Sequence, residues 1–193
     1  MDSTPKFSGK AKVSPLDKPI EKSKSRSDQM SLSAFALIFS ELVQYCEGRV
    51  QLVSEMQSKL SEIGYNVGQR VVDLMLIREK TYKRETRLIN MLIFIRSKVW
   101  MTLFGKEADK LEKGNDEKNI YYIIEREPIV NKFISVPKDK KAINCAAFVG
   151  GIIEAILNEC NFPAKVTVHW HEGTTFMIKF DDSVIARDKL LEK

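Results

Sequence analysis

The chain has 193 residues, of which 44% are hydrophobic, enough for one domain with its own core and a short additional segment. Of the formal net charge of +5, +3 comes from the seven Lys/Arg and four Asp/Glu of residues 1–30, so the rest is nearly neutral and does not favour a nucleic-acid-binding surface. The three cysteines, Cys46, Cys145 and Cys160, form neither a disulfide framework nor a zinc-binding spacing, which favours a reducing, cytoplasmic environment.

Residues 1–30 also contain three prolines and six serines, with few large apolar residues to offset the entropy of ordering them. We expect a disordered basic tail, which either approaches anionic lipid or is only a solvated leader. Residues 31–193 form the expected domain. Its most apolar stretch, residues 88–104, contains Arg96 and Lys98, so we expect no membrane-spanning helix.

The first helix is predicted to start at Ser31 or Ser33, either of which can cap it, and to end at Gly48. Its apolar residues cover about half of the circumference, whereas one core contact needs a stripe of only about 100°. We therefore expect this helix to contact its own core and a second surface. The apolar residues are Leu32, Phe35, Ala36, Ile38, Phe39, Leu42, Val43, Tyr45 and Cys46.

A second, longer helix is predicted over residues 51–79, because apolar residues recur there every three or four positions. Gly64 and Gly68 lie one turn apart beside this seam, and each costs roughly 1 kcal/mol relative to alanine in a helix. They indicate either the close approach of another element or a break at Gly64. The seam consists of Val53, Met56, Leu60, Ile63, Val67, Val71 and Leu74.

Residues 85–104 are apolar nearly all round, which predicts a central core helix that ends at Gly105. After Gly105 the apolar residues no longer recur with the period of a helix. Residues 119–126, rich in Tyr and Ile, predict a strand, and residues 133–136 predict a short strand closed by Pro137.

Residues 144–161 predict a fourth helix capped by Asn144. Residues 165–171 and 174–180 alternate apolar and polar side chains around Glu172-Gly173, which predicts a β-hairpin. A short helix is expected at residues 184–193. This order predicts an α+β fold in which four main helices pack on one face of a small antiparallel sheet.

Few residues suggest chemistry. His169 and His171 point to one face of their strand, but a metal site needs a third ligand, such as Cys160 or a carboxylate, that nothing in the sequence places there. Cys145 follows a helix cap, where the helix N-terminus can activate a thiol, although a buried, inert cysteine is the alternative. No catalytic motif is present, and we expect no metal and no cofactor.

Glu125 and Glu127 share one face of their predicted strand. In a chain with 30% charged residues such pairs are frequent. We interpret the pair as part of a solvated face rather than as an acid–base site.

Residues 60–70 read Leu-Ser-Glu-Ile-Gly-Tyr-Asn-Val-Gly-Gln-Arg and resemble the Gly-Tyr-Asn-x-Gly-x-Arg helix motif of the BET-three-like small subunits of the TRAPP vesicle-tethering complex. Residues 128–137 resemble the later Pro and Phe-hydrophobic-x-hydrophobic-Pro signature of that family, and residues 144–152 its fourth helix. The resemblance extends over about residues 31–190 and implies a BET-three-like fold.

Within the family, residues 103–112, 122–128 and 162–166 resemble one type of subunit. The resemblance implies a non-catalytic structural subunit that bridges a BET-three-type subunit and a longin-like subunit. It also implies a complex that acts as nucleotide-exchange factor for a Rab-type GTPase in ER-to-Golgi transport, with the GTPase reached only indirectly. The expected location is cytoplasmic and peripheral, at the cis-Golgi and the endoplasmic reticulum, with indirect membrane contact.

One departure from the family concerns lipid. The BET-three subunit carries an acylated cysteine between its second and third helices, whereas residues 78–85 here contain no cysteine. We therefore expect no acyl group at this place.

The wide apolar arc and the resemblance together predict a heterodimer contact with the BET-three-type subunit through the first two helices. Two alternatives remain at this point: a domain that binds a hydrophobic ligand, and an enzyme that uses Cys145 or the two histidines. The residues predicted to line or flank the contact are Phe35, Ile38, Phe39, Leu42, Tyr45, Leu60 and Ile63.

Overall fold

The computed structural model describes residues 31–78, 84–115, 117, 119–135 and 143–191. The predicted tail of residues 1–30 lies outside the described residues. In chain order the elements are α1 (Leu32–Glu47), α2 (Val53–Arg78), α3 (Leu88–Phe94), the π-helical segment η3 (Ile95–Val99), α4 (Trp100–Phe104), β1 (Lys110–Lys113), β2 (Ile120–Glu125), α5 (Ile129–Lys132), α6 (Ala147–Glu159), β3 (Ala164–Trp170), β4 (Thr174–Phe180) and α7 (Asp182–Leu190).

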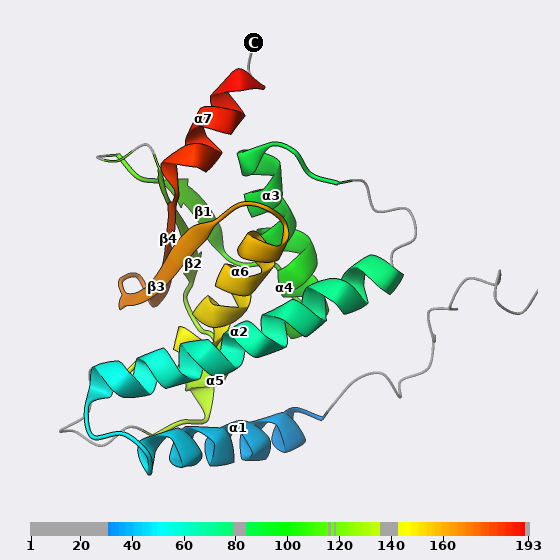
Figure 1. The fold of residues 1–193 in the computed structure, drawn as a ribbon. Helices are drawn as coiled ribbons and strands as arrows, with labels where there is room; N and C mark the ends of the chain where they lie inside the picture. The colour runs from blue at the N-terminus through cyan, green and yellow to red at the C-terminus, as the bar shows by residue number, and fades with distance from the viewer. Residues whose placement is uncertain (1–30, 79–83, 116, 118, 136–142, 192–193) are drawn as a thin grey trace, which may run out of the picture.

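The four strands form an antiparallel sheet in the order β1-β2-β4-β3. Helices α4 and α6 cover the same face of this sheet. Trp100 of α4 makes an edge-to-face contact with Phe176 of β4, their ring centroids 5.6 Å apart. A Cβ added at Gly150 of α6 would lie 2.8 Å from Val168 of β3 and 4.0 Å from Phe176. The predicted α+β arrangement is therefore confirmed (Figure 1).

Helix α2 packs directly on α6, and the glycines make this contact possible. A Cβ at Gly64 would lie only 1.9 Å from the carbonyl oxygen of Phe148, and one at Gly68 would lie 2.7 Å from that of Ile152. From the other side, a Cβ at Gly151 would lie 2.0 Å from the carbonyl oxygen of Ser61. The predicted close approach is confirmed, the approaching element is α6 of the same chain, and α2 is not broken at Gly64.

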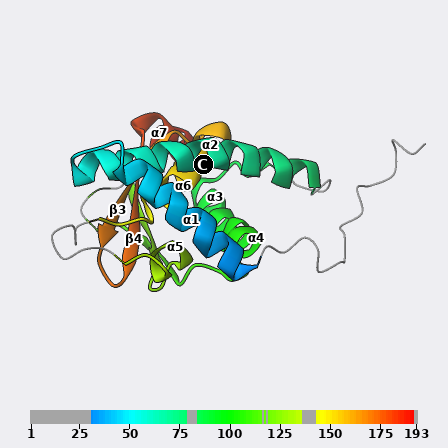
Figure 2. The same cartoon turned by 90° about the horizontal axis from the view of Figure 1, so that it is seen from below.

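Helix α1 begins as predicted. The Ser31 hydroxyl accepts a hydrogen bond from the backbone N–H of Ala34 at 3.2 Å, and Gly48 is the C-cap. The Phe39 ring contacts the Phe148 ring of α6 edge to face, with the centroids 5.4 Å apart. Figure 2 shows that α1 crosses α2 at an angle, so that the two helices diverge toward the start of α1 and the end of α2.

The third helix differs from the prediction. It begins at Leu88 instead of residue 85, and it passes through the π-helical segment η3 before it ends at Gly105, whose φ is 72°. The expected core helix is confirmed on one side, where Leu88, Leu92 and Ile95 are fully buried. Its other side is not covered, because Ile89, Ile93 and Met101 are each about half exposed.

The predicted strand at residues 133–136 is also wrong for the part that the structure describes. Residues 129–132 form the helical turn α5 after Pro128, and no regular structure follows up to residue 135. The side chain of Asn131 donates to the side-chain oxygen of Asn144 at 2.9 Å, which holds this turn against the start of the α6 segment. The sequence did not predict strand β1, which consists of charged residues and one leucine.

The remaining elements agree with the prediction except for the start of the fourth helix: α6 begins at Ala147 with Ala146 as its N-cap, so Asn144 is not the cap residue. Asn144 accepts a hydrogen bond from the N–H of Ala146 at 3.0 Å just before α6. The β3–β4 hairpin turns at Glu172 and Gly173, both with positive φ, and α7 starts two residues earlier than expected.

The α2–α6 contact predicts a large effect of Gly64→Ala. Alanine favours a helix by roughly 1 kcal/mol over glycine. Here its methyl group would push α2 away from α6, so we expect a net loss of about 1–3 kcal/mol of the free energy of unfolding, the usual cost of overpacking. Urea denaturation of both proteins measures this loss.

Gly48→Ala is the matched control, because a Cβ there would meet only the Gln44 carbonyl oxygen at an ordinary 3.6 Å. We expect this control to unfold at nearly the wild-type urea concentration. Equal stability of both variants would contradict the packing described here.

Candidate interaction surface

The structure separates the predicted interface residues by burial. Phe39 and Leu60 belong to the chain's own core, with 4% and 0% of their surface exposed. Phe35, Leu42 and Ile63 are partly buried against that core. Ile38 and Tyr45 are 62% and 49% exposed. Of the seven predicted residues, Ile38 and Tyr45 offer the most surface to a partner, while Phe39 and Leu60 lie beneath that surface in the core.

Ile38 and Tyr45 lie on one flank of α1. Successive residues of an α-helix are about 100° apart, so Ile38 and Tyr45 lie roughly 100–120° from buried Phe39. Phe35 and Leu42 lie between them and the core. The apolar arc therefore continues from the core onto the surface, which is typical of a helix with a second apolar neighbour.

Two residues that the sequence analysis did not include extend this flank. Leu37 is 71% exposed. The Arg49 guanidinium lies 3.6 Å from the centroid of the Tyr45 ring, a cation–π contact just beyond the end of α1. Tyrosine and arginine are enriched among the residues that dominate binding energies. The four-residue spacing of Tyr45 and Arg49 could have indicated this contact from the sequence, although Gly48 between them ends the helix.

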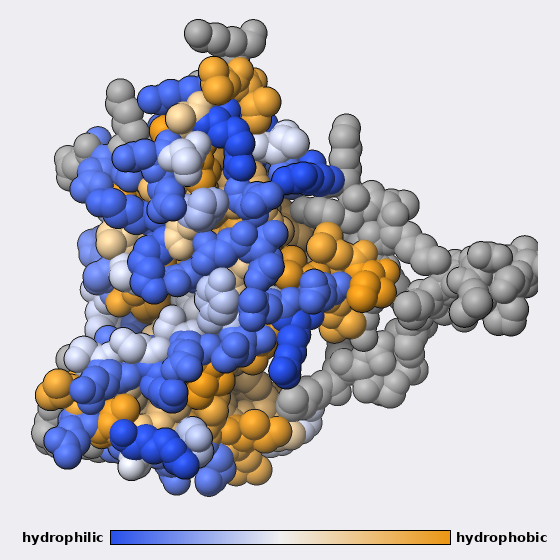
Figure 3. All heavy atoms as spheres, in the orientation of Figure 1, coloured by the Kyte–Doolittle hydropathy of each residue, from blue (hydrophilic) through white to orange (hydrophobic). Residues whose placement is uncertain are grey.

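The far end of α2 is also exposed. Helix α2 has 26 residues and α1 has 16, so α2 is longer by about 15 Å at 1.5 Å per residue. The apolar seam of α2 continues into this uncovered part, where Leu74 is 46% and Ile77 58% exposed. Figure 3 shows hydrophobic residues gathered there and along α1. Exposed apolar surface of this kind is a candidate contact site.

The candidate nucleophile Cys145 is buried, and burial raises the pKa of its thiol to about 11, with a smaller contribution from nearby Cys46. This shift is opposite to the activation that a helix N-terminus can provide. The thiol is therefore almost entirely protonated at neutral pH, which argues against nucleophilic catalysis by Cys145.

The two histidines are exposed. The Nε2 atom of His169 lies 2.9 Å from the hydroxyl oxygen of Thr167. Among the residues that the structure describes, no three His, Cys, Asp or Glu side chains are grouped closely enough to hold a metal ion.

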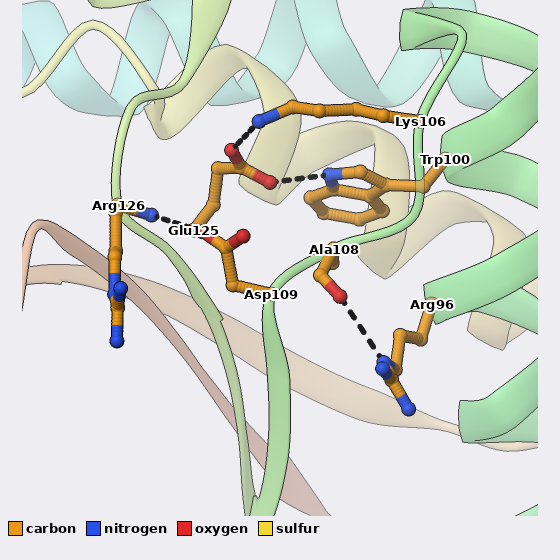
Figure 4. Close-up of polar contacts among 7 residues, drawn as sticks. All are labelled: Arg96, Trp100, Lys106, Ala108, Asp109, Glu125 and Arg126. Atoms are coloured by element: carbon orange, nitrogen blue, oxygen red, sulfur yellow. Dashed lines mark hydrogen bonds and ion pairs between the residues drawn. The ribbon is translucent and has the colours of Figure 1, made fainter.

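Glu127 is exposed, as interpreted, but Glu125 does not lie on a solvated face, so the interpretation was wrong for Glu125. Its side chain is almost fully buried, and it accepts a hydrogen bond from the Trp100 indole N–H at 3.1 Å (Figure 4). The Lys106 ammonium forms an ion pair with its other oxygen. Together with Phe104 and Val149, these residues border a small cavity of about 60 Å³, room for only a few water molecules. A fatty acyl chain does not fit there.

Residues 35–181 match the family model described as "Transport protein particle (TRAPP) component". The chain belongs to this family.

Curated relatives share much of the sequence. The chain is 55% identical to trafficking protein particle complex subunit 5 of Gallus gallus, over 92% of this chain and 93% of the relative. It is 57% identical to subunit 5 of Homo sapiens, over 85% and 87%.

The fold also matches a solved structure. Trafficking protein particle complex subunit 3 of Naegleria fowleri, solved covalently bound to palmitic acid, aligns with a TM-score of 0.68 at 16% identity. The alignment covers 78% of this chain and 95% of that one, and it shows that the fold is that of a TRAPP subunit. The segment expected to lack an acyl group lies mostly outside the described residues, so this expectation stays a prediction. Within the described parts of the chain, no helix is both long and apolar enough to cross a membrane.

The raised pKa of Cys145 predicts a pH dependence of stability. The thiol ionises near its ordinary pKa of 9.0 in the unfolded chain but only near about 11 in the folded one. Its contribution is therefore complete below about pH 9 and is lost as the pH rises toward 11, by up to about 1.4 kcal/mol per pH unit. Urea unfolding at pH 8 and pH 10 measures this contribution to the free energy of unfolding. Between these two values, we expect the wild type to lose about 1 kcal/mol more than Cys145→Ala, and an equal loss would contradict the assignment.

The pair of Lys106 and Glu125 predicts unequal effects of two substitutions. Lys106→Met leaves a buried carboxylate without its cation; because Lys106 is half exposed, we expect a loss of about 2 kcal/mol, below the roughly 3–5 kcal/mol for fully buried pairs. Glu125→Gln keeps an acceptor for Trp100 and lets Lys106 turn to water, so it should cost only about 1 kcal/mol. Urea denaturation of both variants tests the order, and a larger loss for Glu125→Gln would contradict it.

Proposed function

We propose that this chain is a structural, non-catalytic subunit of the TRAPP complex, equivalent to the relatives named subunit 5, and that it works by holding sister subunits together. The observation that carries the proposal is the exposed apolar flank of α1, centred on Ile38 and Tyr45. The relatives' names describe subunits of a trafficking complex, and an assembly subunit needs such a surface.

The flank of α1, with the adjoining residues of α2, contacts the BET-three-type subunit. The exposed end of α2, with Leu74 and Ile77, is a second apolar surface. Two surfaces are what a bridging subunit requires, and the second partner implied by the family resemblance is the longin-like subunit. The assembled complex tethers vesicles and promotes nucleotide exchange on a Rab-type GTPase, which this chain reaches only through its partners. The site of action is the cytoplasmic surface of the cis-Golgi and the endoplasmic reticulum.

A hydrophobic-ligand domain is the second candidate. The palmitic acid of the Naegleria fowleri structure is the observation in its favour, and it concerns that protein. Against it stands the size of the cavity beside Glu125, about 60 Å³.

The double substitution Ile38→Asp and Tyr45→Asp tests the contact. Two carboxylates on the flank would have to be desolvated in the heterodimer, so we expect the Kd for the BET-three-type subunit to rise at least about tenfold, or about 1.4 kcal/mol. Co-purification followed by titration calorimetry measures the change, and circular dichroism should show an unchanged helix content.

Leu190→Asp is the matched control, because Leu190 is 72% exposed and apolar but lies on α7. It should bind the partner like the wild type. Unchanged binding of the double variant would refute the α1 contact.

A further inference from the structure

Strand β3 is an edge of the sheet. It pairs with β4 on one side, and no other strand among the described residues pairs with its outer side. In a strand, neighbouring residues direct their backbone N–H and C=O groups to opposite sides. The N–H of Ala164 donates to the side chain of Asn158 at 3.1 Å, and that of Val166 donates to Glu154 at 2.9 Å. These two residues, and Val168 with them, therefore direct their N–H groups away from β4.

The first half of this edge is protected by the chain itself. Glu154 of α6 accepts the Val166 N–H and also forms an ion pair with Lys165 at 2.9 Å. Side-chain acceptors and lysines of this kind are ordinary ways to block an edge strand. This half is closed to a further strand.

The second half of the edge lacks this protection. Asn158 and Glu154 accept the N–H groups of Ala164 and Val166, but no side chain among the described residues accepts that of Val168. Residues 167–170 also contain no carboxylate, lysine or arginine. An unblocked edge can accept hydrogen bonds from, and donate them to, another extended chain.

The edge forms one wall of an open groove of about 580 Å³, and the amino-terminal half of α2 forms the other wall. Figure 1 shows β3 and this half of α2 on the same side of the molecule. The α2 wall is polar and carries hydroxyl groups, amides and the Glu62 carboxylate. The residues of this wall are Ser54, Gln57, Ser58, Ser61, Glu62, Tyr65 and Asn66.

We propose that this groove binds an extended segment of a partner protein, which adds to the outer edge of β3 beside Val168. The backbone of an extended segment matches the repeat of the strand edge, so main-chain hydrogen bonds supply affinity, and the polar α2 wall favours polar side chains. A second copy of this chain does not fit, because its own β3 is bordered by its own α2. The groove is separate from the α1 flank, so this proposal can fail while the proposed function holds.

Val168→Pro tests the backbone contact. Proline removes the outward N–H but no hydrogen bond to β4, and prolines are tolerated on edge strands for this reason. The probe is a display library of random eight-residue peptides, selected against the full-length chain. We expect the selected peptides to slow hydrogen exchange at the Val168 amide of the wild type. Their Kd should rise at least tenfold with Val168→Pro.

Ser58→Trp is a second variant that leaves β3 untouched and fills the groove from an exposed position of α2. Asp73→Trp, exposed on the same helix outside the groove, is its control. Loss of binding with Ser58→Trp but not with Asp73→Trp supports the proposal, even where Val168→Pro fails to fold. Failure to select any peptide, or selected peptides that bind Ser58→Trp as tightly as the wild type, overturns it. If analytical ultracentrifugation shows self-association that Val168→Pro abolishes, the occupant is a second copy of this chain, and the proposed partner segment is wrong.

Discussion

The contact between α2 and α6 is the constraint on which the rest of the structure depends. The backbones meet so closely at Gly64, Gly68 and Gly151 that no Cβ fits at any of the three. This contact fixes α2 at one distance and one rotation above α6, and α6 in turn packs on β3. Because the glycine side of α2 faces α6, its neighbouring apolar seam is left to receive α1. The position of the α1 flank and the width of the groove beside β3 both follow from this geometry.

The polar groups of the molecule serve structure wherever they are buried. Glu125 would be costly in the core alone, but Trp100 and Lys106 satisfy its two oxygens, so the carboxylate joins the end of β2 to α4 and to the loop after it. The Asn131–Asn144–Thr174 contacts join α5 to the start of the α6 segment and to β4 in the same way. Buried Cys145 belongs to the same core. These arrangements hold the domain together, and the surfaces are left for binding.

The sequence predicted those helices and strands whose formation depends on the local pattern of apolar residues. The helical period of α1, α2 and α6 and the alternation of the hairpin come from the burial of one side, which the order of residues records directly. Strand β1 and the turn α5 were missed or misread, because β1 gains its structure from pairing with β2 and α5 from the side-chain contacts of Asn131. Glu125 looked solvated because its partners lie 25 and 19 residues away and only the fold assembles them. Within the candidate surface, the arc of α1 indicated Ile38 and Tyr45, whereas their separation from Phe39 and Leu60 required knowing which side α2 and α6 cover.

The distribution of apolar surface explains why such a domain favours assembly. The core is complete without the α1 flank: Phe39, Val43 and Cys46 already fill the inner side of α1. Much of the apolar surface of Ile38, Tyr45 and Leu37 therefore stays exposed to water in this chain alone, which is unfavourable. A partner that covers them recovers about 25 cal/mol for each Å² of apolar surface removed from water, less the cost of association. The Arg49 guanidinium, stacked on Tyr45 and donating one N–H to the Tyr45 carbonyl oxygen, has further N–H groups that a partner's acceptor can use.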